Sequence, residues 1–594
     1  MSAPGGDLPF SVLAEYYEKL EATSGRLDMI ALLRDLFRKT PPGVIDKVAY
    51  LTLGRVAPEF IDLELGIGEK LALKAIAMAC GIGEDNVEAK YKELGDMGLV
   101  AEWAIKNKSV LAFLKEELTV GRVFNALVKI AKTSGPSSQD IKLRTLAGLL
   151  ADAEPVEAKY IMRIVTEKLR LGVRDMTILD ALAEAFLGGR HRRDILEKKY
   201  NTYPDIGRIA KALAEKGEEG LEEIGVTLGI PIRPMLAQRL REANEILEKM
   251  GKRFLAEMKY DGERMQIHIW PDGKVEIFSR RLENITHPYP DVIEGVKAAF
   301  KGESAILDGE GVAFNPDTGE LYPFQELMHR RRKYGIEEMM EKYPVVLFLF
   351  DVLYLNGEEL IDKPLEERRK ILEEVIEESD RIKIAEGWIR DWTADELERK
   401  LELAVERGTE GLMVKDLRSR YQAGVRGWSW VKFKRSYVSK MVEPVDLVAV
   451  GAFWGRGKRA GTYGALLLAA YDPETDAFKT VCKMGTGFTD EQLAQLPEIF
   501  KDYVIDHKHP SVVSNIEPDV WFVPAKVLEV IGDEITLSPV HTCAWGKVKP
   551  DAGLAIRFPR FTGRWRDDKS PQDATTEQEI IEMYREQLKE VAEK

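Results

Sequence analysis

The sequence is poor in cysteine and contains no long apolar run. Cys80, Cys482 and Cys543 are the only cysteines among 594 residues, and they form neither metal-ligand pairs nor a disulfide framework. No apolar stretch is long enough to cross a bilayer, and the first residues lack the basic and apolar regions of a signal peptide. These absences predict an intracellular protein, and they exclude a four-cysteine zinc site.

The chain also lacks an excess of positive charge. Its 86 Lys and Arg residues and 100 Asp and Glu residues give a net charge of −14. That balance argues against a protein that coats polyanions over its whole surface, although local basic patches can still bind them. There is no tandem repeat or low-complexity tract. Because 594 residues exceed what one core can hold, we expect three or four domains.

Three zones of different character follow one another. Residues 1–222 read as nearly all helix. Residues 223–437 mix strands and helices, beginning after the extended segment around Pro231 and Pro234. Within them, alternation predicts a strand over 264–270, a mostly apolar run predicts a strand buried on both faces over 345–355, and the charged segment 366–379 is predicted to be helical. Residues 438–594 contain short apolar runs separated by Gly, Asp and Pro, and end in a Glu- and Lys-rich helix. The pattern predicts a multidomain α+β protein with a helical domain, an α/β domain and a C-terminal β-barrel or sandwich.

Within the helical zone, residues 157–171 are predicted to form one amphipathic helix. Apolar residues recur there at helical spacing. Lys159, Arg163 and Arg170 fall on the opposite side as a basic stripe. Such a stripe is as often solvated surface as a binding face, so the residues alone leave both interpretations open.

The middle zone contains Lys259 in the hexapeptide Lys-Tyr-Asp-Gly-Glu-Arg, residues 259–264. Taken alone it could be a charged surface turn. A free lysine has a pKa near 10.4, so only about one in 10³ is neutral at pH 7. A nucleophilic lysine therefore needs neighbouring cations or a metal. The sequence should hold further charged groups that converge on Lys259.

Candidate partners occur downstream. Asp308 and Glu310 are two residues apart, so both carboxylates can point to one face of a strand, and Glu410 begins another predicted strand. Carboxylate oxygens at sparse positions suit Mg²⁺, although each carboxylate alone could simply be solvated. In the strand ending at Lys434, Lys432 and Lys434 share a face. They form either a phosphate-facing edge or a solvated one.

The C-terminal zone adds a cluster of cations interleaved with aromatic residues. It runs from Arg557 through Phe558 and Phe561 to Arg566 and Lys569. That composition is typical of phosphate contacts combined with stacking.

The order of these motifs resembles the covalent nucleotidyltransferase superfamily. The match consists of residues 259–264, 308–310, 350–351, 410–415 and 430–434. Over nearly its whole length the chain further resembles the archaeal and eukaryotic replicative type of ATP-dependent DNA ligase. That likeness rests on residues 65–69, 168–172, 231–237, 482–488 and 557–561.

The resemblance implies three domains: a helical DNA-binding domain (1–222), an adenylation domain (223–437) and an OB-fold domain (438–594). It implies an enzyme that seals nicks in duplex DNA through lysyl-AMP and DNA-adenylate intermediates, in replication, repair and recombination. It also implies a monomer working in the cytoplasm or nucleoid. The expected cofactors are ATP, with ADP, GTP and NAD left open, and Mg²⁺ or Mn²⁺.

The same resemblance assigns roles to individual residues. Lys259 is expected to be the nucleophile that carries AMP. The expected nucleotide contacts are Glu257, Arg264, Arg280, Glu310, Phe350, Arg426, Lys432 and Lys434. The expected metal ligands are Glu310 and Glu410. The expected DNA or pyrophosphate contacts are Lys159, Arg163, Arg170, Arg331, Arg332, Arg557, Arg566 and Lys569.

Two further points stay open at this stage. Residues 108–114 are a candidate sliding-clamp (PCNA) site, but they lack the paired aromatics of such motifs and could be helix core. An RNA ligase or a capping-type nucleotidyltransferase shares the Lys-x-Asp-Gly motif. The long helical zone before Lys259 and the Arg-Phe-Pro-Arg motif argue against both, and the intact set of charged residues argues against an inactive DNA-binding scaffold.

Overall fold

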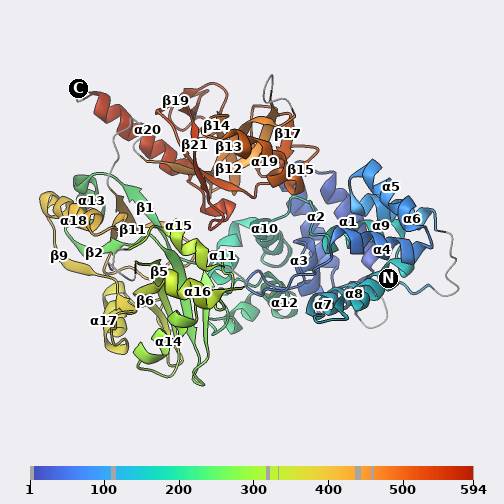
Figure 1. Cartoon of the computed structure of the whole chain (residues 1–594), viewed down its shortest axis with the longest axis horizontal. Coiled ribbons are helices and arrows are strands. Elements are labelled where there is room, and N and C mark those ends of the chain that lie inside the picture. The colour runs from blue at the N-terminus through green and yellow to red at the C-terminus, as the bar shows by residue number, and fades with distance from the viewer. Residues whose placement is uncertain are drawn as a thin grey trace.

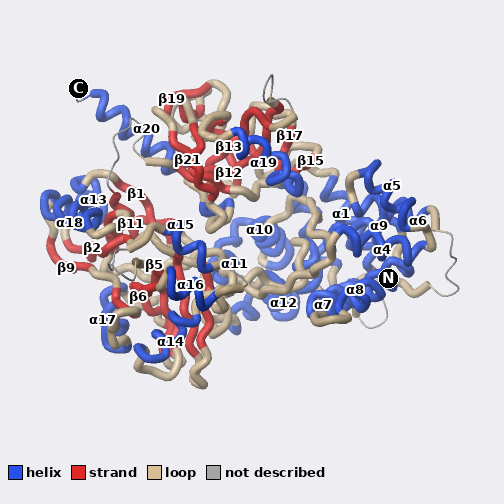
Figure 2. Tube along the Cα trace, in the orientation of Figure 1, coloured by secondary structure: helices blue, strands red, loops and turns tan. Residues whose placement is uncertain are grey.

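The computed structural model describes residues 6–108, 115–315, 321–331, 334–434, 443–455 and 461–592. A helical part, a mixed part and a β-rich part lie around a common centre (Figure 1). Figure 2 separates them by secondary structure, with helices alone on the N-terminal side. Across the described ranges, no helix is both long and apolar enough to span a membrane.

The N-terminal part is a helical domain around one large apolar core. Its helices are α1 (Phe10–Glu21), α2 (Arg26–Lys39), α3 (Ile45–Thr52), α4 (Glu69–Cys80), α5 (Glu84–Leu94), α6 (Met97–Lys106), α7 (Val120–Lys132), α8 (Ser138–Asp152), α9 (Pro155–Val165), α10 (Asp175–Phe186), η1 (Arg190–Arg192), α11 (Arg193–Thr202), α12 (Ile206–Lys216) and η2 (Gly217–Glu223). The prediction of a nearly all-helical zone is confirmed. The apolar faces of these helices pack against one another because each helix must bury its apolar stripe.

The predicted helix over residues 157–171 is wrong at its C-terminal end. Helix α9 begins at Pro155, which fits a helix N-terminus, and ends at Val165. Glu167 then has φ 58°, a left-handed conformation that stops the helix. Leu169 and Arg170 continue the helical spacing in the sequence, but they lie in a loop.

The middle part contains two sheets flanked by helices. One sheet has the order β1 (Leu236–Leu240), β11 (Arg426–Lys434), β10 (Gly411–Lys415), β2 (Arg253–Lys259), β9 (Gly387–Asp391). The other has the order β4 (Val275–Ser279), β3 (Glu263–Ile269), β5 (Ala305–Ala313), β6 (Val345–Leu355), β7 (Glu358–Glu359), with β8 (Ile382–Ile384) beside β6. Its helices are α13 (Ala243–Met250), α14 (Pro290–Ala299), α15 (Phe324–Leu327), η3 (Met328–Arg330), α16 (Ile336–Lys342), α17 (Leu365–Val375) and α18 (Ala394–Glu406).

The apolar run predicted to be a doubly buried strand is β6, with the expected bounds Val345–Leu355. Strand β3 lies one residue before the predicted 264–270, and helix α17 covers the predicted 366–379 only as far as Val375. Each sheet has an apolar core of its own, and a third apolar cluster that includes Phe350 of β6 and Trp430 of β11 joins the two sheets.

The C-terminal part is β-rich, as predicted. Its strands are β12 (Val445–Trp454), β13 (Tyr463–Asp472), β14 (Ala477–Met484), β15 (Val504–Ile505), β16 (Val512–Val513), β17 (Val520–Phe522), β18 (Val527–Ile531), β19 (Glu534–Ser538), β20 (Gly553–Arg557) and β21 (Arg560–Trp565). Its helices are α19 (Asp490–Phe500), η5 (Lys501–Tyr503), η6 (Pro571–Asp573) and α20 (Glu577–Ala592). Helix α20 lies toward β1 and α13 of the middle part (Figure 1).

The β-rich part also contacts the helical domain. Arg170 donates to the carbonyl oxygens of Asp502, at 2.5 Å, and of Val504. Arg174 forms an ion pair with Asp476 at 3.3 Å. The loop that follows α9 is therefore covered by the β-rich part in this arrangement.

Candidate nucleotide-transfer site

Strand register brings Lys259 and Glu410 together, although they are far apart in sequence. Lys259 ends β2 and pairs with Gly411 of the antiparallel β10, and the Glu410 amide donates to the Lys259 carbonyl at 2.9 Å. On its other side Gly411 pairs with Lys434 of β11. Three motifs of the sequence thus meet on adjacent strands of one sheet.

Two glycines of these motifs are required by close backbone approach. A Cβ at Gly262 would lie 2.2 Å from the carbonyl oxygen of Gly311. Gly411 has φ 141°, and a Cβ there would lie 2.3 Å from the carbonyl oxygen of Phe433. Larger residues would therefore push the neighbouring strands apart. The glycines keep Lys259 and Glu410 against their neighbours.

The Glu410 carboxylate lies between two lysines. Lys259 Nζ contacts its Oε2 atom, and Lys434 Nζ lies 3.0 Å from the same atom. Burial alone would raise the pKa of Glu410, but the two ammonium groups outweigh it and hold that pKa well below its usual range. A lysine ammonium has no free electron pair. Lys259 must therefore lose a proton and leave Glu410 before it can act as a nucleophile.

These residues face a pocket of about 540 Å³ between the two sheets and the β-rich part. The volume is in the range of small-molecule sites. The expected nucleotide contacts that line it are Glu257, Arg264, Arg280, Glu310, Phe350, Arg426, Lys432 and Lys434. The structure thus brings the predicted set together around Lys259.

The expected same-face pair Asp308 and Glu310 separates into two environments. Asp308 is bound by Arg264, with Nη2 to Oδ2 at 2.7 Å and Nε to Oδ1 at 3.1 Å, and also by the Tyr421 hydroxyl at 2.8 Å. Glu310 faces the pocket. Asp308 therefore holds Arg264 in place, while Glu310 remains available to a ligand.

Glu310 and Glu410 fit a divalent cation by their chemistry. Burial raises the pKa of Glu310 to about 8, against the opposing effect of Lys259 and Arg264. Within the described ranges, no hydrogen bond to the Glu310 carboxyl is found. Two hard oxygen donors in a pocket that is also lined by lysines and arginines match the way Mg²⁺ binds through few carboxylates plus substrate oxygens.

One end of the pocket is aromatic. Phe350 and Trp430 pack edge to face with ring centroids 6.0 Å apart, and both line the pocket. Glu257 also lines the pocket, with only 2% of its surface exposed, and is bound by Lys415 at 2.6 Å and Arg369 at 2.7 Å. A flat aromatic base would find here both a stacking surface and a polar edge. Arg369 was not among the residues predicted from the sequence.

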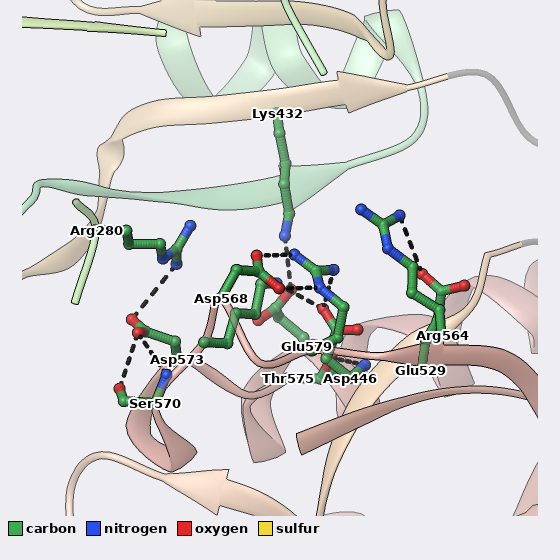
Figure 3. Close-up of polar contacts among 12 residues, drawn as sticks. Arg280, Lys432, Asp446, Glu529, Arg564, Asp568, Ser570, Asp573, Thr575 and Glu579 are labelled. Atoms are coloured by element: carbon green, nitrogen blue, oxygen red, sulfur yellow. Dashed lines mark hydrogen bonds and ion pairs between the residues drawn. The ribbon is translucent and has the colours of Figure 1, made fainter. Parts of the chain in front are cut away.

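The β-rich part supplies carboxylates that pair with the pocket's cations (Figure 3). Glu579 of α20 accepts from Arg426 at 2.6 Å and lies 3.3 Å from Lys432. Asp573 lies 3.4 Å from Arg280. Burial alone would raise the pKa of Glu579, but Arg426 and Lys432 hold that pKa far below its usual range. Burial lowers the pKa of Lys432 to about 8, with Glu579 opposing the shift.

Arg566 and Lys569 also lie in the pocket wall, where both contact Asp446. Arg566 binds Asp446 at 3.0 Å and Asp568 at 2.7 Å, and Lys569 binds Asp446 at 2.5 Å. Burial lowers the pKa of Lys569 to about 7, although Asp446 counteracts it. Arg557 lies apart from them, exposed on β20 and paired with Glu534 at 3.2 Å. The sequence pointed to these cations, but not to Asp446, Asp573 or Glu579. In the sequence, Glu579 was only one of several glutamates in a predicted helix, and no pattern distinguished it from the others.

The predicted basic stripe on the helical domain is wrong as a shared face. Arg163 is 9% exposed and pairs with Glu21 at 2.8 Å and Asp96 at 2.9 Å. Lys159 pairs with Glu21 at 3.4 Å, and Arg170 lies beyond the end of α9 against the β-rich part. Acidic residues of neighbouring helices pair with Lys159 and Arg163. The periodicity of a single helix could not predict these partners.

Arg331 lies in the pocket wall, where it contacts the buried Glu263 and pairs with Glu283 at 3.2 Å. The neighbouring Arg332 falls outside the described residues. So do residues 109–114 of the candidate clamp segment.

A strand-end lysine between two sheets, with carboxylates, further lysines and an aromatic wall around one pocket, defines a covalent nucleotidyltransferase. Family sequence models narrow that class. "DNA ligase N terminus" matches residues 9–183, "ATP dependent DNA ligase domain" matches 234–434, and "ATP dependent DNA ligase C terminal region" matches 459–569.

Curated relatives agree over almost the whole chain. The chain is 65% identical to "DNA ligase 2" of Korarchaeum cryptofilum, covering 98% of each sequence. It is 57% identical to "DNA ligase 2" of Thermofilum pendens and 54% identical to "DNA ligase" of Caldivirga maquilingensis, again covering 98% of each. The chain belongs to the ATP-dependent DNA ligase family. The family implies ATP, a divalent metal ion and nicked DNA as the substrate.

Proposed function

We propose that this ligase seals nicks in duplex DNA by forming lysyl-AMP at Lys259 and then a DNA-adenylate. The observation that carries the assignment is the contact of Lys259 with Glu410 beside Lys434, in the wall of a pocket that further cations line. A nucleophile, its polar partners and the phosphate-binding groups converge there on strands brought together by register.

The reaction assigned to this site has three balanced steps. Lys259 Nζ, having lost its proton, attacks the α-phosphorus of ATP; a P–N bond forms and pyrophosphate leaves. A 5′-phosphate oxygen of the nick then attacks the same phosphorus, and the P–N bond breaks. Finally the 3′-hydroxyl attacks the 5′-phosphate, loses its proton and displaces AMP.

Cations of the pocket offset negative charge as it builds during the first step. Lys432 and Lys434 project from β11 toward the pocket, and Arg426 lies at the start of the same strand. Fixed charges act strongly in such a site because little water competes with them. Arg264 and Arg280 are assigned to the ribose and phosphates.

Glu310 and Glu410 would hold the divalent metal ion, Mg²⁺ or Mn²⁺. When bound, such an ion neutralises phosphate charge and lowers the barrier to displacement. A Glu410 carboxylate that binds the metal ion would no longer hold the Lys259 ammonium group. Metal binding and the contact with Lys259 are therefore compatible as successive roles of Glu410.

Phe350 is assigned to stacking on the base and Glu257 to its edge. ATP is the nucleotide that the family implies. Use of ADP, GTP or NAD in addition remains a proposal, which a sealing assay with each nucleotide in turn tests.

Contacts with DNA and pyrophosphate are assigned less narrowly. We propose that Arg557, Arg566 and Lys569 act on pyrophosphate or DNA, and that Lys159, Arg163, Arg170, Arg331 and Arg332 contact the duplex. Arg163 pairs with Asp96 and Arg331 contacts the buried Glu263, which favours a supporting role for these two arginines.

The broader setting is proposed on the same basis. The domains are taken as 1–222, 223–437 and 438–594, acting as a monomer on DNA in the cytoplasm or nucleoid, in replication, repair and recombination. A sliding clamp is proposed to bind residues 108–114. Full clamp affinity in a Phe113→Ala protein would contradict that part.

The proposed function is tested by sealing a nicked duplex that carries a labelled 5′-phosphate, with ATP and Mg²⁺. The wild-type protein is expected to convert it to the longer strand, and Lys259→Ala is expected to leave it open. A pre-adenylated nick separates the steps, because Lys259→Ala should still seal it. A wild-type protein that seals neither substrate would contradict the proposal.

A further inference from the structure

The aromatic end of the pocket contains a buried group of charges in which Glu257 and Lys415 belong to the expected set but Arg369 does not. Glu257 Oε1 accepts from Lys415 Nζ at 2.6 Å, and its Oε2 accepts from Arg369 Nη1 at 2.7 Å. Lysine and arginine side chains can only donate. Both oxygens of Glu257 therefore act as acceptors in this arrangement.

The two cations stand in different positions relative to the pocket. Lys415 lines it, with its ammonium 4.4 Å from the Phe350 ring centroid and 4.3 Å from that of Trp430. Arg369 of α17 is 8% exposed and reaches Glu257 from the far side; it is not among the described residues that line the pocket. Arg369 can thus set the position of Glu257 without touching a ligand.

Arg369 is itself held in place from two further directions. Its Nη2 atom donates to the Ala385 carbonyl at 2.6 Å, and its Nε atom donates to Glu373 at 3.0 Å. The planar guanidinium therefore has little freedom to follow a moving carboxylate. The Glu257 carboxylate is therefore held between the Arg369 guanidinium and the Lys415 ammonium group.

We propose that Arg369 is a positioning residue that makes the pocket select a 6-amino purine over a 6-oxo purine. The inference rests on the proposed binding of the nucleotide base in this pocket. Each carboxylate oxygen of Glu257 has two acceptor sites, so one remains beyond each existing contact. An amine at purine position 6 donates to it, whereas a carbonyl there would place two acceptors together.

Removal of Arg369 frees one oxygen of Glu257. The carboxylate can then turn so that both oxygens meet Lys415, and the acceptor at the base edge loses its fixed place. The preference for the amine falls as a result, while the cations around Lys259 are unchanged.

The test compares ATP with ITP, which carries a carbonyl at position 6. Self-adenylation and self-inosinylation of the full chain are followed by intact-protein mass, giving kcat/KM for each nucleotide. Arg369→Ala is expected to lower the ATP-to-ITP ratio about tenfold, mainly through slower reaction with ATP. Arg369→Lys, which keeps the charge, is expected to restore part of the ratio.

Lys370→Ala is the matched control. Lys370 is the next residue of α17 and is exposed, and its substitution by alanine removes one positive charge, as Arg369→Ala does. Its ratio should equal that of the wild type. Arg369→Gln serves if the alanine variant does not fold. A folded Arg369 variant with the wild-type ratio, including one that slows both nucleotides equally, would overturn the inference. A wild-type protein that forms no adduct with either nucleotide would instead overturn the proposed function, and this inference with it.

Discussion

Glu579 of the C-terminal helix α20 accepts a hydrogen bond from Arg426 at 2.6 Å. Its carboxylate therefore pairs with a cation of the nucleotide pocket. The same carboxylate lies 3.3 Å from Lys432. In the proposed first step these two cations face phosphate oxygens, and Glu579 must then leave them. The contact between Glu579 and Arg426 therefore competes with ATP.

We expect Glu579→Gln to lower the KM for ATP in self-adenylation by about threefold to tenfold, because a neutral amide competes less well than a carboxylate. The nucleotide-free variant should also melt at a lower temperature, since Arg426 and Lys432 lose their partner. Glu498→Gln, at an exposed position of α19, is the control and should change neither value. An unchanged or higher KM in Glu579→Gln would contradict the competition.

Asp476 holds the β-rich domain against the helical domain. Its carboxylate, nearly fully buried, pairs with Arg174 at 3.3 Å and with Arg26 at 3.6 Å. Because Asp476 has φ 48°, asparagine is the substitution that this backbone tolerates best. We expect Asp476→Asn to tighten binding of nicked DNA by about threefold, since the loop containing Arg170 and Arg174 becomes easier to uncover.

Binding is measured by fluorescence anisotropy of a labelled nicked duplex at two salt concentrations. Asp551→Asn, an exposed residue with φ 59°, is the matched control. The idea fails if the Asp476 and Asp551 variants bind the duplex equally well.

His268 makes the stability depend on pH. It is fully buried; Nδ1 accepts from the Gly229 amide at 3.0 Å and Nε2 lies 2.9 Å from Gln266 Oε1. Burial lowers the pKa of His268 to about 3. Since an unfolded histidine titrates near 6.5, the stabilisation is present above about pH 6.5 and is lost as the pH falls toward about 3.

At pH 5 the loss from His268 alone should reach about 2 kcal/mol relative to pH 7. His268→Asn can keep the hydrogen bond of the Nδ1 atom through its own Oδ1 atom, and it does not titrate. We expect the melting temperature of the wild type to fall more between pH 7 and pH 5 than that of the variant. Equal falls would show that His268 does not carry the effect.

Asp351 and Arg368 form a pair with no exposed surface, at 2.8 Å. Asp351 belongs to a motif of the sequence, yet its partner places it in the core rather than in the pocket. Arg368→Ala should lower the free energy of unfolding by about 3–5 kcal/mol, because Asp351 is left buried and unpaired. Arg420→Ala breaks an exposed pair with Asp362 and should change it by less than about 1 kcal/mol. Similar losses in chemical denaturation would contradict this distinction.

Local patterns in the sequence predicted most of the elements that carry the site. Strand β6 has the predicted bounds because an apolar run of that length fits a doubly buried strand. Lys432 and Lys434 share a face of β11 because side chains alternate along a strand. The nucleophile and its neighbours were found because their motifs keep a fixed order.

Contacts between distant segments were beyond those patterns. Nothing near Arg163 in the sequence marks Asp96 as its partner, and nothing in α20 marks Glu579 rather than its neighbours as the residue that reaches Arg426. The end of α9 was missed because Glu167 adopts a left-handed conformation, which a glutamate in the sequence does not predict. Arg369 escaped notice because it acts on Glu257 from outside the pocket.

The most direct test of the central claim is to map the adenylated residue. The wild-type protein is incubated with ATP and Mg²⁺, digested, and analysed by tandem mass spectrometry. AMP should be found on the peptide that contains Lys259, at its Nζ atom, and should be absent in Lys259→Ala. AMP on any other residue of the wild-type protein, or an adduct that persists in Lys259→Ala, would contradict the account.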